Sequence, residues 1–263
     1  MAFSGVDFLF DNQYSEGYGL KIVSINGNST ADADAGSQIE ILNNSVFRKP
    51  TKYQYGVSYS EVLSFDMEVS SETPIIAINR SKIQKWLFGR MTPCKLQIIQ
   101  PDLQTIYFNC FLINAKTTYI ANSCYGFTFT VECDAPWGWE LPKWHMCPSF
   151  TEIWKFYNDS DNTDYTCPLM EIKMNDSIMN NGNISLINQT DGNREMKFLN
   201  LNAKEVIKID CSLQKIESSE KRLLSEFFNK KFFRMLSGLN EIKITGEIDY
   251  LKMFYSNVRK VGG

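Results

Sequence analysis

The residues of this sequence that are best suited to metal or acid–base chemistry lie around its single histidine. His145 is closely followed by Cys147 and is preceded at a distance by Cys133. Zinc in proteins takes four ligands, usually in closely spaced pairs, and only His145 and Cys147 form such a pair here. A serine or cysteine nucleophile would also need His145 as its base, and no Gly-x-Ser-x-Gly sequence is present. We therefore predict no catalytic residue, no metal site and no cofactor, and we expect that the protein is not an enzyme.

Three tryptophans, Trp137, Trp139 and Trp144, gather around the stretch VECDAPWGWELP at residues 131–142. Clustered tryptophans can stack on sugars, so a carbohydrate-binding β-sandwich module that mediates surface adhesion is one hypothesis. Prolines on both sides stiffen the chain where its pattern changes, which favours a hinge at the seam between two domains. The predicted hinge consists of Pro136, Trp137, Gly138, Trp139 and Pro142.

The composition supports ordinary folded domains. The 263-residue chain is 43% hydrophobic and 13% aromatic, so it can fill two cores. Its net charge of −3 argues against a general nucleic-acid binder, which needs a strongly basic surface. Seven scattered cysteines indicate free thiols and synthesis in a reducing cytoplasm. Because the N-terminus lacks a signal-peptide pattern and no apolar run reaches the roughly 18 residues of a membrane span, we expect no membrane insertion.

The first part of the chain, residues 1–142, is predicted to be a mostly β domain with one helix. Alternating stretches such as YGFTFTVECD are typical of strands with one buried face. The stretch INRSKIQKWLFGR predicts a helix that Asn79 caps and Gly89 ends. Ile83, Trp86 and Leu87 fall on one face of this helix, so they are predicted to pack on the sheet.

The remainder, residues 143–263, has a different pattern. Short strands such as LMEIKM, GNISLIN and NEIKITG alternate with turns rich in Asn, Asp and Gly, and this spacing is typical of a β-sandwich. The stretch ESSEKRLLSEFFNKK suits either a short helix or a structured loop between strands. The sequence therefore predicts two domains that are both mainly β.

Three stretches in the same order carry a family resemblance: FLFDNQYSEGYGLKIVSI, FTFTVECDAPWGWE and FNKKFFRMLSGLNEIKITGEIDYLKMFYSNVRKVGG. Together they resemble the distal tail protein of long, non-contractile-tailed bacteriophages, over effectively the whole chain. The resemblance implies an N-terminal split β-barrel with a helix, similar to the tail-tube fold, and a C-terminal galectin-like β-sandwich. Both agree with the strand and helix patterns.

The resemblance also implies a place in the virion. Such proteins form a homohexameric ring at the distal end of the tail, which is a hub between the tail tube, the tail-tip or tail-associated lysin protein and the receptor-binding apparatus. Contact with the tape measure protein also follows. The central channel would let DNA pass during genome ejection without specific binding, because an acidic lumen repels phosphates.

The resemblance further implies a long hairpin between residues 25 and 70 that joins neighbouring subunits. Interfaces of this kind gain affinity from main-chain hydrogen bonds between strands. The residues assigned to this subunit-interface arm are Gln38, Ile39, Glu40, Ile41, Tyr53 and Tyr55.

Overall fold

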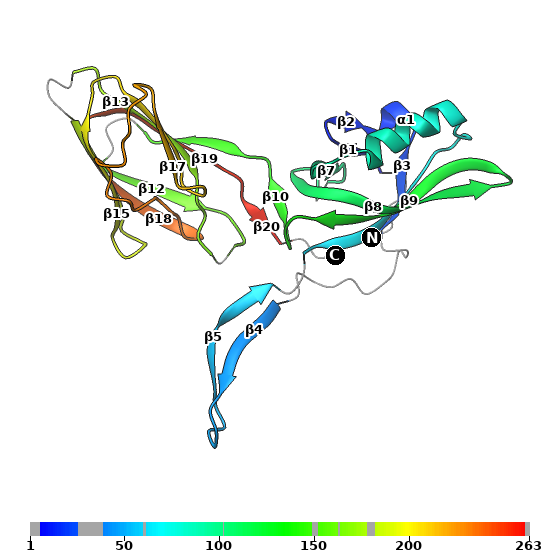
Figure 1. Cartoon of the computed structure of the whole chain (residues 1–263), viewed down its shortest axis with the longest axis horizontal. Coiled ribbons are helices and arrows are strands. Elements are labelled where there is room, and N and C mark those ends of the chain that lie inside the picture. The colour runs from blue at the N-terminus through cyan, green and yellow to red at the C-terminus, as the bar shows by residue number, and fades with distance from the viewer. Residues whose placement is uncertain are drawn as a thin grey trace. The chain divides into compact units, whose positions relative to one another are not determined.

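The computed structural model describes residues 6–25, 39–59, 62–101, 103–148, 152–162, 164–177 and 182–260. These residues are mainly β, in several antiparallel sheets with one α-helix (Figure 1). They form two compact units. Unit 1 runs to Glu140 and includes Arg259 and Lys260, whereas unit 2 is Leu141–Val258. The predicted second domain, 143–263, differs at its end, because Arg259 and Lys260 pack with unit 1. Within the described ranges, no helix has the length and apolar character that crossing a bilayer requires.

The main sheet of unit 1 follows the order β2-β1-β7-β8-β9-β6-β3, and β10 pairs with β8 and β20. A short 3-10 helix, η1 (Ser15–Tyr18), follows β2. The strands are β1 (Phe8–Phe10), β2 (Gln13–Tyr14), β3 (Lys21–Ile25), β6 (Ser64–Ser70), β7 (Cys94–Ile98), β8 (Ile106–Ile120), β9 (Ser123–Cys133), β10 (Gly138–Glu140) and β20 (Val258–Arg259).

This strand path is open, so the described residues form no closed barrel. Among the described residues, the β1 end and the β3 end of this path are joined by one isolated bridge. There the backbone N–H of Ile22 on β3 donates to the carbonyl of Val6, just before β1, at 2.8 Å. A single bridge leaves most of the seam unpaired. The split β-barrel expected from the sequence is therefore an antiparallel sheet whose ends approach at one point.

The alternation in the sequence sets the two faces of β9. Phe127, Phe129 and Val131 are buried in the core of unit 1, whereas Glu132 is exposed. This is the result expected when successive side chains of a strand point to opposite faces. The strand prediction for this stretch is confirmed.

Helix α1 (Ala77–Phe88) carries the three predicted packing residues on its buried face, since Ile83, Trp86 and Leu87 are all nearly inaccessible. The indole Nε1 of Trp86 donates to the carbonyl of Phe10 at 3.0 Å, and its ring stacks on Tyr18 at 4.5 Å between centroids. Trp86 thus joins the helix to β1 and η1.

The predicted cap at Asn79 was wrong, whereas the predicted end at Gly89 is confirmed, although not in the left-handed conformation that was expected. The N-cap is Ile76, whose side chain makes no capping hydrogen bond, so Asn79 lies inside the first turn. Gly89 ends the helix at a φ of −90°, outside the left-handed region. Glycine is favoured at this position because the Lys85 carbonyl oxygen lies so close to it: a Cβ on residue 89 would be 2.6 Å from that oxygen.

Unit 2 is a two-sheet sandwich. One sheet follows the order β11-β19-β13-β16-β17 and the other β12-β18-β14-β15. Inward residues of both sheets, among them Ile172, Ile207, Leu186 and Ile242, share one hydrophobic core. The strands are β11 (Lys143–Met146), β12 (Ile153–Asn158), β13 (Leu169–Met174), β14 (Gly182–Asn188), β15 (Arg194–Leu201), β16 (Val206–Asp210), β17 (Lys215–Ser218), β18 (Gly238–Thr245) and β19 (Ile248–Tyr255).

The segment 219–237 between β17 and β18 is a structured loop, so of the two predicted alternatives the loop is correct. It is held by its own apolar side chains. Leu224, Phe228 and Phe233 are buried in the core, and Phe228 stacks on Phe198 of β15 at 4.6 Å. The loop therefore covers the core of unit 2 without regular backbone pairing.

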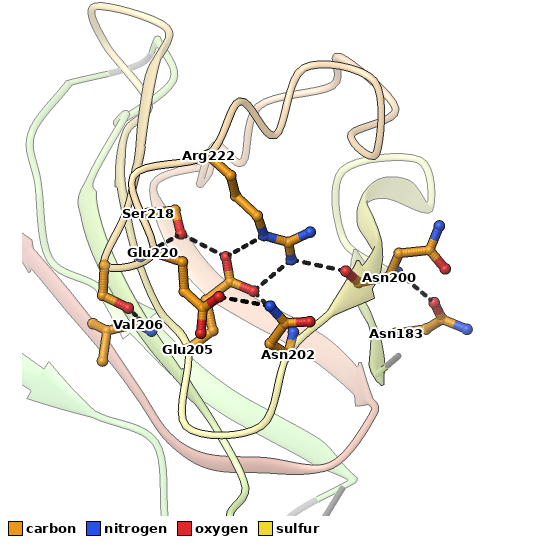
Figure 2. Close-up of polar contacts among 9 residues, drawn as sticks. Asn183, Asn200, Asn202, Glu205, Val206, Ser218, Glu220 and Arg222 are labelled. Carbon is orange, nitrogen blue, oxygen red and sulfur yellow. Dashed lines mark hydrogen bonds and ion pairs between the residues drawn. The ribbon is translucent and has the colours of Figure 1, made fainter. Parts of the chain in front are cut away.

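A buried carboxylate anchors the start of this loop (Figure 2). Glu205, with a fully buried side chain, accepts hydrogen bonds from Ser218 Oγ at 2.5 Å and from Arg222 Nε at 3.0 Å. It also accepts one from the backbone N–H of Asn202 at 2.9 Å, and Arg222 Nη2 donates to the carbonyl of Asn200 at 2.7 Å. Burial alone raises the pKa of Glu205, but the hydrogen bonds and the Arg222 charge outweigh it and lower the pKa.

Gly126 generates the first prediction, because β9 passes close to β6 at this residue. A Cβ there would lie 2.1 Å from the carbonyl oxygen of Val69, so Gly126→Ala must displace backbone. We expect a loss of roughly 1–3 kcal/mol in the free energy of unfolding, as for other overpacked sites. Gly17→Ala is the matched control, since a Cβ there meets nothing within 4 Å. Equal urea midpoints for the two variants would contradict this account.

A second prediction concerns the charge of Glu205. Because the folded-state pKa is lowered, its stabilisation is present above the usual glutamate pKa and is lost as pH falls through the folded value. Glu205→Gln should lower the free energy of unfolding at pH 7 by roughly 1–3 kcal/mol. Urea unfolding should show this gap shrinking as the pH falls below about 5. Glu226→Gln, on the exposed side of the same loop, is the control; a gap that stays constant with pH would argue against the ion pair.

Candidate functional site

The most exposed apolar element among the described residues is a hairpin of β4 (Ile39–Ser45) and β5 (Lys52–Tyr59). These two strands pair with each other and with no other described strand (Figure 1). An isolated two-stranded hairpin is only marginally stable in water. A stable sheet usually needs a third strand or another element packed on its apolar face. The apolar side chains of this hairpin are instead exposed.

The hairpin carries four large apolar or aromatic side chains near one another. The register places Ile41 opposite Val57, and an irregularity at Tyr55 shifts the pairing so that Tyr53 lies opposite Asn44. All four side chains are exposed, Tyr55 by 68%. Several exposed apolar side chains gathered on one small element are a mark of an interaction surface. We call these four residues the arm stripe.

The arm residues predicted from the sequence fall largely on this hairpin. Glu40 and Ile41 lie on β4 and Tyr53 and Tyr55 on β5, all exposed, and Ile39 begins β4. Gln38 lies outside the described residues. The sequence-based prediction missed Val57, although it continues the alternating stretch YQYGVSY that would have revealed it. The interface role of these residues stays a prediction.

The turn of the hairpin is basic. Residues 41–60 include Arg48, Lys49 and Lys52 and no acidic residue, whereas the whole chain has a net charge of −3. Arg48, at a positive φ of 65°, holds its guanidinium over the ring of Phe47 at 5.2 Å, and Lys49 Nζ donates to Tyr53 Oη at 3.2 Å. Phe47 is 86% exposed. The turn thus presents an aromatic ring among three positive charges, which suits an acidic surface.

Of the predicted hinge residues, Gly138 and Trp139 lie on β10, in the sheet of unit 1. Trp139 pairs with Tyr107 of β8, and the rings of Trp137 and Trp139 meet edge to face at 6.1 Å. Gly138 is needed for close approach, because a Cβ would lie 2.4 Å from Ile106 Cγ2.

The passage to unit 2 follows Glu140. Pro136, Trp137 and the two hinge residues on β10 precede it, while Pro142 lies just beyond it. Trp144 also lies in unit 2, on β11 against Phe254 at 4.8 Å. The three clustered tryptophans of the sequence therefore belong to different units. A hinge motion at this stretch stays a prediction.

An ion pair joins the points where the chain leaves and re-enters unit 1. Arg259 Nε and Nη2 both donate to Glu140 Oε1, at 3.0 and 2.8 Å, and both side chains are mostly buried. We call this pair the 140–259 clasp. The sequence contains no signal for it, because the partners lie 119 residues apart.

The residues considered for metal or nucleophilic chemistry are packing groups. His145 lies between the rings of Phe156 and Tyr255, and burial, with the charge of Lys143, lowers its pKa. Burial raises the pKa of the Cys147 thiol to about 11. Among the described residues, no group of three or more His, Cys, Asp or Glu side chains is arranged to hold a metal ion.

Two family models match the sequence. One, described as a phage tail protein N-terminal domain, matches residues 3–135, and the other, described as a phage tail C-terminal domain, matches residues 137–255. No curated protein sequence matches the chain.

Solved structures share the fold over nearly the whole chain. The Dit protein of phage SPP1, described as a paradigm of the hub adsorption apparatus in phages that infect Gram-positive bacteria, matches with a TM-score of 0.69 at 11% identity. The match covers 97% of this chain and 99% of the Dit chain. Two structures of the activated baseplate of phage p2, one with calcium and one with strontium, match with a TM-score of 0.52 at 9% identity. They cover 95% of this chain and 97% and 98% of the respective baseplate chains.

The exposure of the hairpin generates a third prediction. Tyr55→Ser and Phe47→Ser should change the free energy of unfolding by no more than about 0.5 kcal/mol, because these side chains bury little surface within the chain. Phe127→Ala, in the core of unit 1, should cost roughly 3–5 kcal/mol. Urea unfolding, at concentrations where light scattering shows single copies, measures both. A large loss for Tyr55→Ser would mean that the hairpin packs on its own chain.

Proposed function

Since the chain belongs to the family of phage tail proteins whose N- and C-terminal domains match residues 3–135 and 137–255, we propose that it is a structural hub at the distal end of a long, non-contractile bacteriophage tail. The observation that carries this proposal is the two-unit fold shared with the SPP1 Dit protein along 97% of the chain. The hub would join the tail tube to the tail-tip or tail-associated lysin protein and the receptor-binding apparatus. It would also meet the tape measure protein inside the tail.

In this proposal six copies form a ring, and the hairpin of β4 and β5 joins neighbours. A head-to-tail ring closes only when one patch of each copy fits a different patch of the next. The arm stripe supplies an apolar patch, and the outer edges of β4 and β5 supply backbone groups that pair with no other described strand. Strand addition at such an edge combines main-chain hydrogen bonds with side-chain contacts.

The proposed ring surrounds a channel through which DNA passes during genome ejection. The net charge of −3 supports passage without specific binding, since an acidic lumen repels phosphates. The role is structural and not enzymatic. Its chemical support is that the candidate thiols are buried with raised pKa values and His145 packs between aromatic rings.

Ring formation generates a fourth prediction. At rising concentration, light scattering behind a sizing column should show masses that approach a hexamer. A triple variant, Ile41→Ser with Tyr55→Ser and Val57→Ser, should need at least about tenfold more protein to assemble, because it removes three of the four side chains of the arm stripe. Leu223→Ser, exposed in unit 2, is the matched control and should assemble normally.

The location in the virion needs a separate measurement. Antibody against the protein, carried on gold particles, should label one end of the tails in electron micrographs. A single copy at every concentration, together with labelling along the tube or none on the tail, would overturn the hub. Assembly equal to that of the original chain in the triple variant would overturn the role of the hairpin alone.

A further inference from the structure

The outward face of the β11-β19-β13-β16-β17 sheet in unit 2 carries a row of large apolar side chains. The strand register places Trp144 opposite Phe254, and Phe254 opposite Leu169. The row continues to Asp210, opposite Leu169, and ends at Lys215. Trp144 is 57% exposed, with one part of its ring against Phe254. One end of the row is therefore an open aromatic surface and the other end is polar.

A second row, two positions along, is charged on β19, β13, β16 and β17, whereas β11 contributes Met146 opposite Lys252. Lys252 lies opposite Glu171, Glu171 opposite Lys208, and Lys208 opposite Glu217. The signs alternate across the sheet, and Tyr250 Oη donates to Glu171 Oε1 at 2.7 Å. Donors and acceptors thus stand side by side next to the apolar row.

The two rows border a hollow of about 360 Å³. Its wall on one side is the turn after β16, where Asp210 Oδ1 accepts from the backbone N–H groups of Ser212 and Leu213. This turn presents Leu213 to solvent beside the hollow. The size lies within the range of pockets that hold small ligands.

We propose that this hollow binds a neutral carbohydrate, with Trp144 as the stacking surface. A sugar ring has a face of C–H groups that packs on an aromatic ring and an edge of hydroxyls that both donate and accept hydrogen bonds. The hollow offers the same division, with Trp144 and Leu169 on one side and Glu171, Lys208 and Glu217 on the other.

The charges select the kind of ligand. The two rows together hold three lysines and three carboxylates, so the face has no net charge that would attract a polyanion or a polycation. A protein partner fits less well, because the centre of a protein interface is depleted of charged residues, whereas here Glu171 and Lys208 lie in the middle strands of the sheet. A polyhydroxylated, uncharged ligand satisfies both conditions.

The fifth prediction is therefore glycan binding by the purified full chain. Saturation-transfer NMR with neutral disaccharides of glucose, galactose, N-acetylglucosamine, N-acetylgalactosamine and rhamnose should show transfer into ring protons for at least one of them. Trp144→Ala should weaken that binding about tenfold or more. Lys208→Gln, which changes one exposed side chain, should weaken it severalfold and guards against misfolding of the tryptophan variant.

The control variant is Tyr157→Ala, which removes an exposed aromatic ring from the other sheet of unit 2 and should bind as the original chain does. Polyglycerol phosphate is the polyanion comparison and should not compete. Three results would each overturn the proposal. They are no transfer to any of the sugars at millimolar concentration, binding by the Trp144 and Lys208 variants that equals binding by the original chain, and binding only to polyglycerol phosphate. Ring assembly is measured separately, so failure of the hub and failure of this site are distinguishable.

Discussion

The chain leaves unit 1 after Glu140 and returns to it at Arg259, so unit 1 is completed by residues from both ends of the sequence. The 140–259 clasp holds these two crossings together through a mostly buried ion pair. A buried carboxylate and guanidinium are stabilising only as a pair, because each is costly to bury alone. The last strand of unit 1 therefore depends on a contact that forms only after all of unit 2 has been synthesised.

In unit 2, an irregular loop covers part of the hydrophobic core. The segment 219–237 inserts aromatic side chains into the sandwich, and the Glu205–Arg222 pair fixes its start. At the end of the loop, Asn240 of β18 accepts at Oδ1 from the backbone N–H of Leu236 at 3.0 Å, and its Nδ2 donates to the Leu236 carbonyl at 2.8 Å. Polar anchors thus replace the ladder of hydrogen bonds that regular strands would supply.

Local patterns were sufficient to predict the mainly β fold and the faces of its elements, because alternation and helical spacing are properties of neighbouring residues. Phe127 and Phe129 on β9 and Trp86 on α1 are examples. The helix start at Ile76 was missed, since burial of the helix overrode the missing cap. The Glu140–Arg259 contact and the rows on the outer face of unit 2 depend on pairing between distant strands. Trp139 and Trp144 are close in the sequence but belong to different units.

The basic turn of the hairpin has a consequence for the behaviour of many copies before they assemble. Strand edges that carry apolar side chains tend to pair with identical edges, which leads to aggregation. Two identical hairpins that paired side by side in the same direction would bring Arg48, Lys49 and Lys52 of each copy close to the same three charges of the other. This repulsion acts against self-association of like with like, and it is absent when the hairpin meets a surface of opposite sign. The turn therefore protects the free protein from the wrong contact during the interval in which its adhesive strands are still exposed.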